Sequence, residues 1–182
     1  MIPTVEQCFE YMEKYEMLDN IRAHSIVVEK VANLIARALL DAGVDVVIEK
    51  ITAGALLHDI GKTLCLKTGG DHAAKGEEIC YENQLYEIAD IVGEHVRFKS
   101  YRPDKAISEK EIVYYADKRV NHDTVVSLEE RLDYLLKQYG NNDENLCKRM
   151  RRNFDLCKEV ERKLFADLTF GPEEMAAKVG EG

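Results

Sequence analysis

Leu56-Leu57-His58-Asp59-Ile60-Gly61-Lys62 is the stretch around which this chain of 182 residues is organised. It places a histidine and an aspartate side by side at the end of an apolar run. Imidazole and carboxylate groups are the side chains that hold catalytic divalent cations. Two adjacent ligands cannot complete a coordination shell. The stretch therefore predicts a metal centre only if other helices bring further ligands to the same point.

Two of the candidate ligands fall on the apolar faces of long predicted helices. The stretch 21–43 has apolar residues at helical spacing, and His24 lies on that stripe. A further helix is expected over 45–61, with Gly61 at its end, and it carries His58 on its inward face. Both imidazoles are thus expected to point into the interior of the protein.

Two more histidines follow further along the chain. A loop containing two glycines is expected over 64–71, and His72 then opens a helix that runs to about residue 83. His95 continues the helical pattern of apolar residues over 85–95. A histidine in a first helical turn and one on an apolar face could both reach the cleft that the loop borders.

Asp117 is expected on the inward face of another helix, since it shares a helix face with Val113 and Val120. A buried ionised carboxylate is costly unless it is paired or bound to a metal. The alternative to a metal is a salt bridge to Lys118, Arg119 or another base. Taken with the histidines, Asp117 favours the metal centre.

The sequence predicts an all-α fold of about seven to nine helices. Capping boxes at Thr4, Ser108 and Ser127 and a capping Asp143 mark helix starts, and no stretch has a clear strand period. We expect an N-terminal helix over 1–19 that packs on the core, a main domain over 20–140, and a C-terminal helical extension over 141–182. The extension is expected to contain a short piece over 172–178 and a disordered Gly-Glu-Gly tail.

Composition limits the classes of function. Hydrophobic residues make up 46% and charged residues 32%, as in ordinary globular proteins, and the net charge is −9. A chain this acidic is not expected to bind nucleic acid through its phosphates, although a local basic loop can serve a small phosphorylated substrate. Five cysteines without a C-x-x-C pair, no signal peptide and no long apolar run predict a cytoplasmic protein that does not enter a membrane. The sequence is also compatible with a homodimer.

These residues carry a resemblance to a known family. His24, the pair His58-Asp59 followed by Ile-Gly-Lys, and Asp117 resemble the H…HD…D signature of the HD-domain superfamily of metal-dependent phosphohydrolases, in its HDIG form. The resemblance covers about residues 20–137. It implies an HD-domain-like bundle of helices.

The resemblance also implies a set of metal ligands. His24, His58, Asp59 and Asp117 correspond to the ligands of a first cation, with Asp59 able to bridge two, and His72 and His95 stand where dinuclear members carry additional histidines. One or two divalent ions are therefore expected, and Fe, Mn, Co, Ni and Zn are not distinguished by such ligands. His122 matches nothing in the family and is expected to be a solvated loop residue.

The implied activity is hydrolysis of a phosphate ester or anhydride by attack of a metal-bound hydroxide, with Asp59 and Lys62 in catalytic roles. Lys62 either holds a phosphate oxygen or is a solvent-facing residue at a helix end. The expected substrate is a nucleotide or a dinucleoside polyphosphate. The chain lacks a separate Gly-Tyr-Pro motif, which counts against cyclic dinucleotides.

The loop that follows His95 is the densest basic patch in the sequence. Arg97, Lys99 and Arg102 are candidate phosphate contacts, because the loop must border the metal centre if His95 reaches it. Aromatic residues in the same loop, Phe98 or Tyr101, could stack on a base.

Two alternative functions remain open. The same order of ligands also resembles the HD-type di-iron oxygenases, in which two irons activate oxygen. The chain could instead be a non-catalytic HD module for binding or signalling, although the retained ligand set argues against it.

Overall fold

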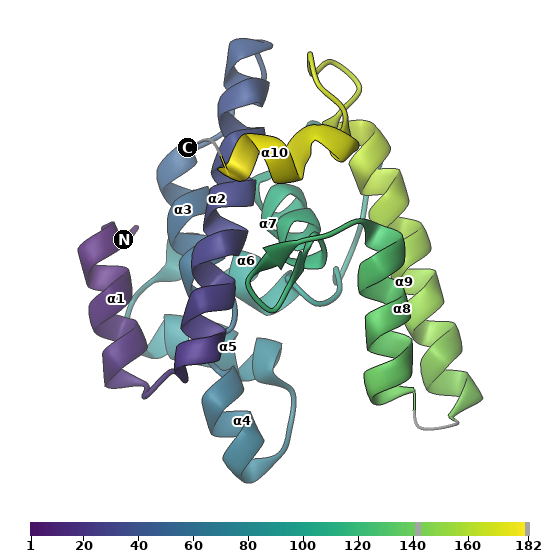
Figure 1. Ribbon diagram of the computed structural model, residues 1–182. Coiled ribbons are helices and arrows are strands. Elements are labelled where there is room, and N and C mark those ends of the chain that lie inside the picture. The colour runs from purple at the N-terminus through teal and green to yellow at the C-terminus, as the bar shows by residue number, and fades with distance from the viewer. Residues whose placement is uncertain (141–142, 181–182) are drawn as a thin grey trace.

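The computed structural model describes residues 1–140 and 143–180 (Figure 1). Four helices pack against one another at its centre: α2 (Asp19–Asp41), α3 (Ile48–Leu57), α6 (Tyr86–Glu94) and α7 (Glu109–Lys118). The predicted all-α class is confirmed, because in the described residues the only sheet is a pair of two-residue strands.

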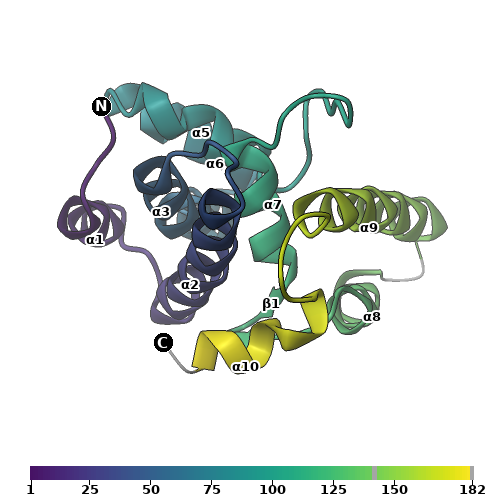
Figure 2. The same ribbon diagram turned by 90° about the horizontal axis from the view of Figure 1, so that it is seen from above.

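The remaining helices surround this centre. Helix α1 (Val5–Lys14) packs on α3, and α4 (Lys62–Thr68) packs on α5 (His72–Glu82), which lies along α6. Helices α8 (Leu128–Tyr139) and α9 (Glu144–Leu164) lie side by side on the far side of α7 from α1 (Figure 2). The chain ends in η1 (Pro172–Glu174) and α10 (Met175–Gly180), which crosses α2.

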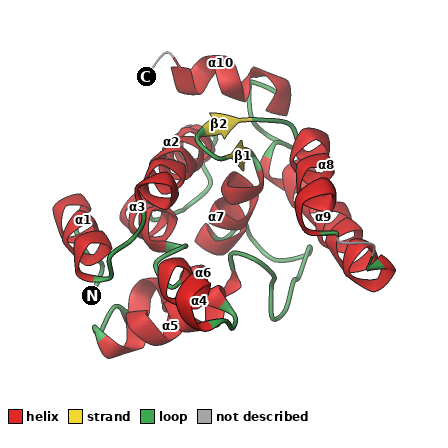
Figure 3. Cartoon of the chain, turned by 60° about the horizontal axis from the view of Figure 1, so that its bottom comes forward, coloured by secondary structure: helices red, strands yellow, loops and turns green. Residues whose placement is uncertain are grey.

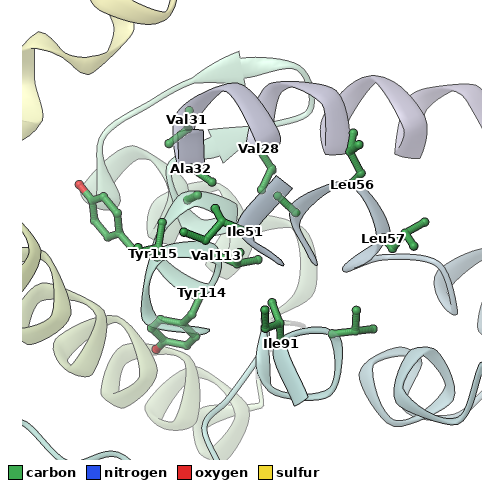
Figure 4. Packing of buried hydrophobic residues seen from close by; sticks show 14 of the residues in the cluster. Val28, Val31, Ala32, Ile51, Leu56, Leu57, Ile91, Val113, Tyr114 and Tyr115 are labelled. Carbon is green, nitrogen blue, oxygen red and sulfur yellow. The ribbon is translucent and has the colours of Figure 1, made fainter. Parts of the chain in front are cut away.

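The core fills the space between the central helices. Figure 4 shows Val28 and Ala32 of α2, Ile51 of α3, Ile91 of α6 and Val113 of α7 converging there, and each is at most 3% exposed. Burying an aliphatic side chain of the larger kind contributes about 1.5–3 kcal/mol. The core therefore fixes the relative positions of the helices that carry the candidate ligands.

The predicted helix starts agree with the structure. The Gln7 amide N–H donates to the Thr4 hydroxyl at 3.3 Å, and the Ser108 N–H donates to a Glu111 carboxylate oxygen at 2.8 Å. The Ser127 hydroxyl accepts the N–H of the residue three positions on at 3.2 Å. These caps satisfy N–H groups that have no partner within the helix.

The loop predicted over 64–71 is wrong for most of its length, because residues 62–68 form helix α4. The glycine pair acts only at the end of that helix, where Gly69 and Gly70 have φ of +78° and +104°. Thr63 anchors the helix, since its buried hydroxyl accepts the Leu18 N–H at 3.2 Å. This tertiary contact leaves no periodic signal in the sequence.

A short hairpin was not predicted. Strands β1 (Val120–Asn121) and β2 (Thr124–Val125) pair antiparallel, and the tight turn between them holds His122 at φ +54° (Figure 3). Two-residue strands are too short to show a period in the sequence. The hairpin lies against α2, which brings the turn close to His24.

The terminal segments are tied to the core. Cys8 and Met12 of α1 are fully buried, and α9 buries its apolar stripe against α7. Of the predicted Gly-Glu-Gly tail, only the first glycine lies within the described residues.

All five cysteines are free thiols. Among the described helices, none combines the length and the apolar character needed to cross a bilayer.

Candidate metal centre

The six predicted ligands meet at one point, although they come from five separate segments. His24 lies on α2, His58 follows the last turn of α3, His72 begins α5, His95 follows α6, and Asp117 lies on α7. His24 Nε2 is 3.0 Å from Asp117 Oδ1, and His72 Nε2 is 3.2 Å from His95 Nε2. The structure therefore brings together every residue that the sequence proposed as a ligand.

Asp59 stands at the centre of this cluster and faces two groups of ligands. Its Oδ2 is 3.5 Å from His58 Nε2, whereas its Oδ1 is 3.3 Å from His72 Nε2 and 3.5 Å from His95 Nε2. Two ligand triads result, and Asp59 belongs to both: His24, His58 and Asp59, and Asp59, His72 and His95. One carboxylate could thus bridge two cations.

Backbone carbonyls fix the orientation of three of the histidines. Nδ1 of His24 lies 2.8 Å from the carbonyl oxygen of His122, and Nδ1 of His58 lies 2.7 Å from that of Ala55. Nδ1 of His95 has the same kind of partner at 2.6 Å. A carbonyl only accepts hydrogen bonds, so each Nδ1 carries a proton, and Nε2 is the ring nitrogen left to face the carboxylates, either with a second proton or, in the neutral ring, with a lone pair for a cation. This arrangement is typical of metal-binding histidines.

The Nε2 atoms need a positive charge among them. His58 Nε2 is fully buried and has no hydrogen-bond partner, and its nearest neighbours are oxygens of Asp59 and Asp117. Lone pairs that face carboxylates repel unless a proton or a cation lies between them. The unpartnered buried nitrogen is therefore the observation that best fits a bound metal.

The spacing of the ligand atoms also suits a cation. Ligands about 2.1 Å from a metal lie about 3.0 Å apart in an octahedral shell and about 3.4 Å apart in a tetrahedral one. In the first triad His58 Nε2 lies 3.5 Å from Asp59 Oδ2, and in the second the separations run from 3.2 Å, between the Nε2 atoms of His72 and His95, to 3.5 Å, between His95 Nε2 and Asp59 Oδ1. The residues present thus fit a divalent ion in each triad.

The buried carboxylates stay ionised in this setting. Burial raises the pKa of Asp59, but His58, His72 and His95 act more strongly and hold that pKa well below its ordinary value. Burial likewise opposes ionisation of Asp117, and the hydrogen bond from His24 and the charge of Lys118 hold its pKa low. Both groups are therefore negative and ready to bind a cation near neutral pH.

Gly61 makes the close approach of the two triads possible. A Cβ atom at this position would lie 2.5 Å from the His72 carbonyl oxygen and 2.7 Å from the Gly76 amide nitrogen. Contacts this short do not occur between real side chains and backbone. Gly61, two residues after Asp59, thus lets the start of α5 pack directly on the turn that carries Asp59.

Lys62 lies beside the ligands, on the wall of a cavity. Its Nζ is 2.7 Å from Asp59 Oδ2, and its side chain is 39% exposed. Burial lowers the pKa of Lys62, but Asp59 has the larger effect in total, so the pKa is raised. Lys62 is therefore a charged group at the centre, paired with Asp59, and not a helix-end residue that faces only solvent.

The cavity has a volume of about 580 Å³ and reaches from the ligands to the C-terminal helices. Its floor includes His24, Asp59 and His72, and its far wall consists of residues from α8 and α9. The residues on that wall are Arg131, Tyr134, Leu135, Tyr139, Asn153 and Phe154.

The basic loop does not line this cavity. Lys99 Nζ is 2.6 Å from a Glu77 carboxylate oxygen, and Arg102 pairs with Asp104 at 3.1 Å. Arg97 is exposed and is not among the residues around the cavity. The expectation that these three residues contact phosphate is therefore not supported, because none of them lines the cavity and two of them pair with carboxylates elsewhere.

The loop aromatics also differ from the expectation. Phe98 packs on the buried ring of Tyr114, with centroids 4.2 Å apart, and stacks on Tyr101 at 5.5 Å. Its ring is thus used to hold the loop on the core and does not face the cavity. Base stacking by these two residues is not supported.

Sequence reasoning missed two contributions to the site. His122 is exposed, as expected, but its carbonyl oxygen orients His24, and only the hairpin reveals this contact. Arg131 and Tyr134 lie on the cavity wall although they were read only as part of a helix. Their spacing with Leu135 puts them on one helix face, and this was the available signal.

Comparison with known proteins gives one matching family and several relatives. The HD domain family matches residues 21–121. The tRNA (cytidine(56)-2'-O)-methyltransferase of Picrophilus torridus is 32% identical over 149 residues, which covers 72% of this chain and 40% of that protein. Ribonuclease Y of Thermosipho melanesiensis is 43% identical over 77 residues, which covers 42% of this chain and 14% of that protein. The chain thus spans less than half of the length of either relative, and no solved structure matches it.

Proposed function

Because this chain belongs to the HD domain family, a superfamily of metal-dependent phosphohydrolases, we propose that it hydrolyses a phosphate ester or anhydride. The proposed substrate is a nucleotide or a dinucleoside polyphosphate. The observation that carries the proposal is the position of Asp59, whose two oxygens face two separate sets of histidine nitrogens. This arrangement suits two cations that share one carboxylate.

Divalent cations in such a centre supply Lewis acidity, since they polarise phosphoryl oxygens and lower the pKa of water. The protein holds the histidine lone pairs toward them through the carbonyl oxygens of Ala55, Val92 and His122. The rings therefore do not need to reorient when charge develops on the substrate.

Lys62 is proposed to bind a phosphate oxygen. Its Nζ lies 2.7 Å from Asp59 Oδ2 and faces the cavity. Asp59 would give its charge to a bound cation, and the Lys62 ammonium group would then be available for an anionic ligand. Lysine serves such ligands as a point charge.

Lys118 is proposed to position Asp117. Its buried Nζ donates to the carbonyl oxygen of His95 at 2.8 Å and lies 3.6 Å from Asp117 Oδ2. The same group sits 3.7 Å from the centroid of the Tyr114 ring. Held on three sides, it keeps Asp117 Oδ1 turned toward His24 and His58.

One of the two relatives, Ribonuclease Y, supports cleavage of a phosphate ester, and the other does not bear on it. Ribonuclease Y is by its name a nuclease, and cleavage of RNA is cleavage of a phosphate ester. The match to the tRNA methyltransferase covers 40% of that protein, so methyl transfer is not carried over to this chain.

The test is a hydrolysis screen on metal-loaded protein that measures free phosphate and, by chromatography, nucleotide products, because cleavage of a dinucleoside polyphosphate gives two nucleotides. Wild-type protein, His58→Ala and the surface control Asp133→Asn are loaded with Mn²⁺, Co²⁺ or, without oxygen, Fe²⁺, and are offered nucleoside mono- and diphosphates and dinucleoside polyphosphates. We expect hydrolysis by wild type and Asp133→Asn and none by His58→Ala. Substrate-dependent oxygen uptake by the iron form without hydrolysis would instead identify a di-iron oxygenase. No turnover by a fully loaded protein would identify a binding module.

A further inference from the structure

The cavity extends well beyond the metal centre, toward α8. A volume of about 580 Å³ lies within the range of about 300–1,000 Å³ that is usual for small-molecule sites. It is larger than a phosphate group needs. The part away from the ligands is bounded by Arg131, Tyr134 and Leu135, which share one face of α8. A substrate held at the metal centre therefore has room to extend toward this helix face.

Arg131 brings a positive charge to the cavity without an acidic partner. One guanidinium nitrogen donates to the Asn121 side-chain oxygen at 2.8 Å, while Nε is buried and has no hydrogen-bond partner. In the described part of the chain, no carboxylate forms an ion pair with it. Arg119, by contrast, pairs with Glu161. An unpaired guanidinium on a cavity wall indicates an anionic ligand.

Arg131 also lies close to the other bases of the site. Lys62, Lys118 and Arg131 all line the same cavity. Basic side chains on one cavity wall suit an anion such as a phosphate group.

Tyr134 and Leu135 provide an apolar surface beside Arg131. Both are half-buried, and the Tyr134 ring meets the His122 ring edge-on with centroids 5.2 Å apart. The Arg131 guanidinium carbon lies 5.8 Å from the centroid of the Tyr134 ring. Aromatic rings and guanidinium planes are surfaces on which planar ring systems stack.

We propose that α8 is the substrate-recognition wall of this site: Arg131 binds the oxygens of the reacting phosphate that face away from the metal ligands, and Tyr134 with Leu135 binds a planar ring carried by the same molecule. This inference rests on the proposed function for the placement of the reacting phosphate. The ligand class is a nucleoside phosphate, and stacking is tolerant of which base it carries.

The test measures binding and not turnover, so it remains informative if the protein hydrolyses nothing. The probes are two compounds that resist hydrolysis: the analogue of AMP in which a methylene group replaces the ester oxygen, and methylphosphonate, which has the same head and no ring. Titration calorimetry compares wild type, Arg131→Gln and Tyr134→Leu, all loaded with Mn²⁺. Arg37→Gln and Tyr81→Leu, exposed residues remote from the cavity lining, are the matched controls.

We expect wild type to bind the AMP analogue at least about tenfold more tightly than methylphosphonate, because stacking of one base on an aromatic ring contributes that much affinity. Tyr134→Leu should lose most of that preference and keep its affinity for methylphosphonate. Arg131→Gln, whose amide can still donate to Asn121, should bind the AMP analogue about tenfold more weakly. The bound Mn²⁺ should be unchanged in both variants and in the controls.

Equal affinity of wild type for the two probes would overturn the role of the ring surface, and that result needs no variant. Unchanged affinity of a folded, metal-loaded Arg131→Gln would overturn the role of Arg131. Absence of any hydrolysis together with the expected binding pattern would refute the proposed function and leave the recognition wall intact.

Discussion

Replacing Asp59 with asparagine is expected to remove both bound cations. The side chain is almost completely buried, and its oxygens lie 3.3–3.5 Å from the Nε2 atoms of His58, His72 and His95. An amide has one neutral oxygen where the carboxylate has two charged ones, so no charged ligand is shared and at most one triad keeps a neutral oxygen at this position. Removing a group that only hydrogen-bonds to a metal ligand typically lowers the metal affinity about 10–100-fold. Loss of a direct ligand to both ions should cost more.

The size of the effect follows from linkage between binding and folding. A cation at 100 times its Kd stabilises the folded protein by about 2.7 kcal/mol. For a chain of this length, each 1 kcal/mol raises the Tm by about 2–4 °C, so each filled site should raise it by about 5–11 °C. Asp59→Asn should show almost none of this increase.

The assay is thermal unfolding of metal-free protein with and without Mn²⁺, together with elemental analysis after gel filtration. The control is Asp133→Asn, an exposed aspartate on α8 that does not line the cavity. It should bind as much metal as wild type and show the same rise in Tm. A full metal-dependent rise in Asp59→Asn would refute the bridging role that the structure assigns to this carboxylate.

Three further predictions concern neighbouring residues. His95→Ala should halve the metal content, because it removes a ligand from one triad only; an unchanged ratio in elemental analysis would mean a single site. Lys62→Ala should keep its metal and raise the KM or lower the kcat for phosphate release, and unaltered kinetics would exclude Lys62 from substrate contact. Gly61→Ala should destabilise the fold by about 1–3 kcal/mol in urea unfolding through the clash with the His72 carbonyl, and Gly180→Ala, where a Cβ meets nothing within 4 Å, is the control. Equal stability of these two glycine variants would contradict the packing described for Gly61.

The helices could be predicted where the signal is local. Thr4, Ser108 and Ser127 cap helices within three or four residues of themselves, so the sequence alone shows these starts. Helix α4 and the β1–β2 hairpin were missed for the opposite reason. They depend on contacts with distant residues, such as the bond from the Leu18 N–H to Thr63, that leave no periodic pattern.

The metal centre could be predicted because its ligands lie on buried helix stripes or at helix ends. A histidine such as His24 among valines and isoleucines points toward the core, and the core is where the helices converge. The recognition wall could not be predicted in this way. Nothing in the sequence distinguishes Arg131 from the loop residue Arg97 as a ligand contact. Only the packing of α8 shows that Arg131 lines the cavity and Arg97 does not.

The most direct test of the central claim is a crystal structure of the Mn²⁺-loaded protein with anomalous scattering recorded for the metal. We predict two anomalous peaks, one held by His24, His58, Asp59 and Asp117 and the other by Asp59, His72 and His95, with the two oxygens of Asp59 divided between them. No peak at Asp59, or a metal bound elsewhere on the protein while the six side chains remain without one, would contradict it.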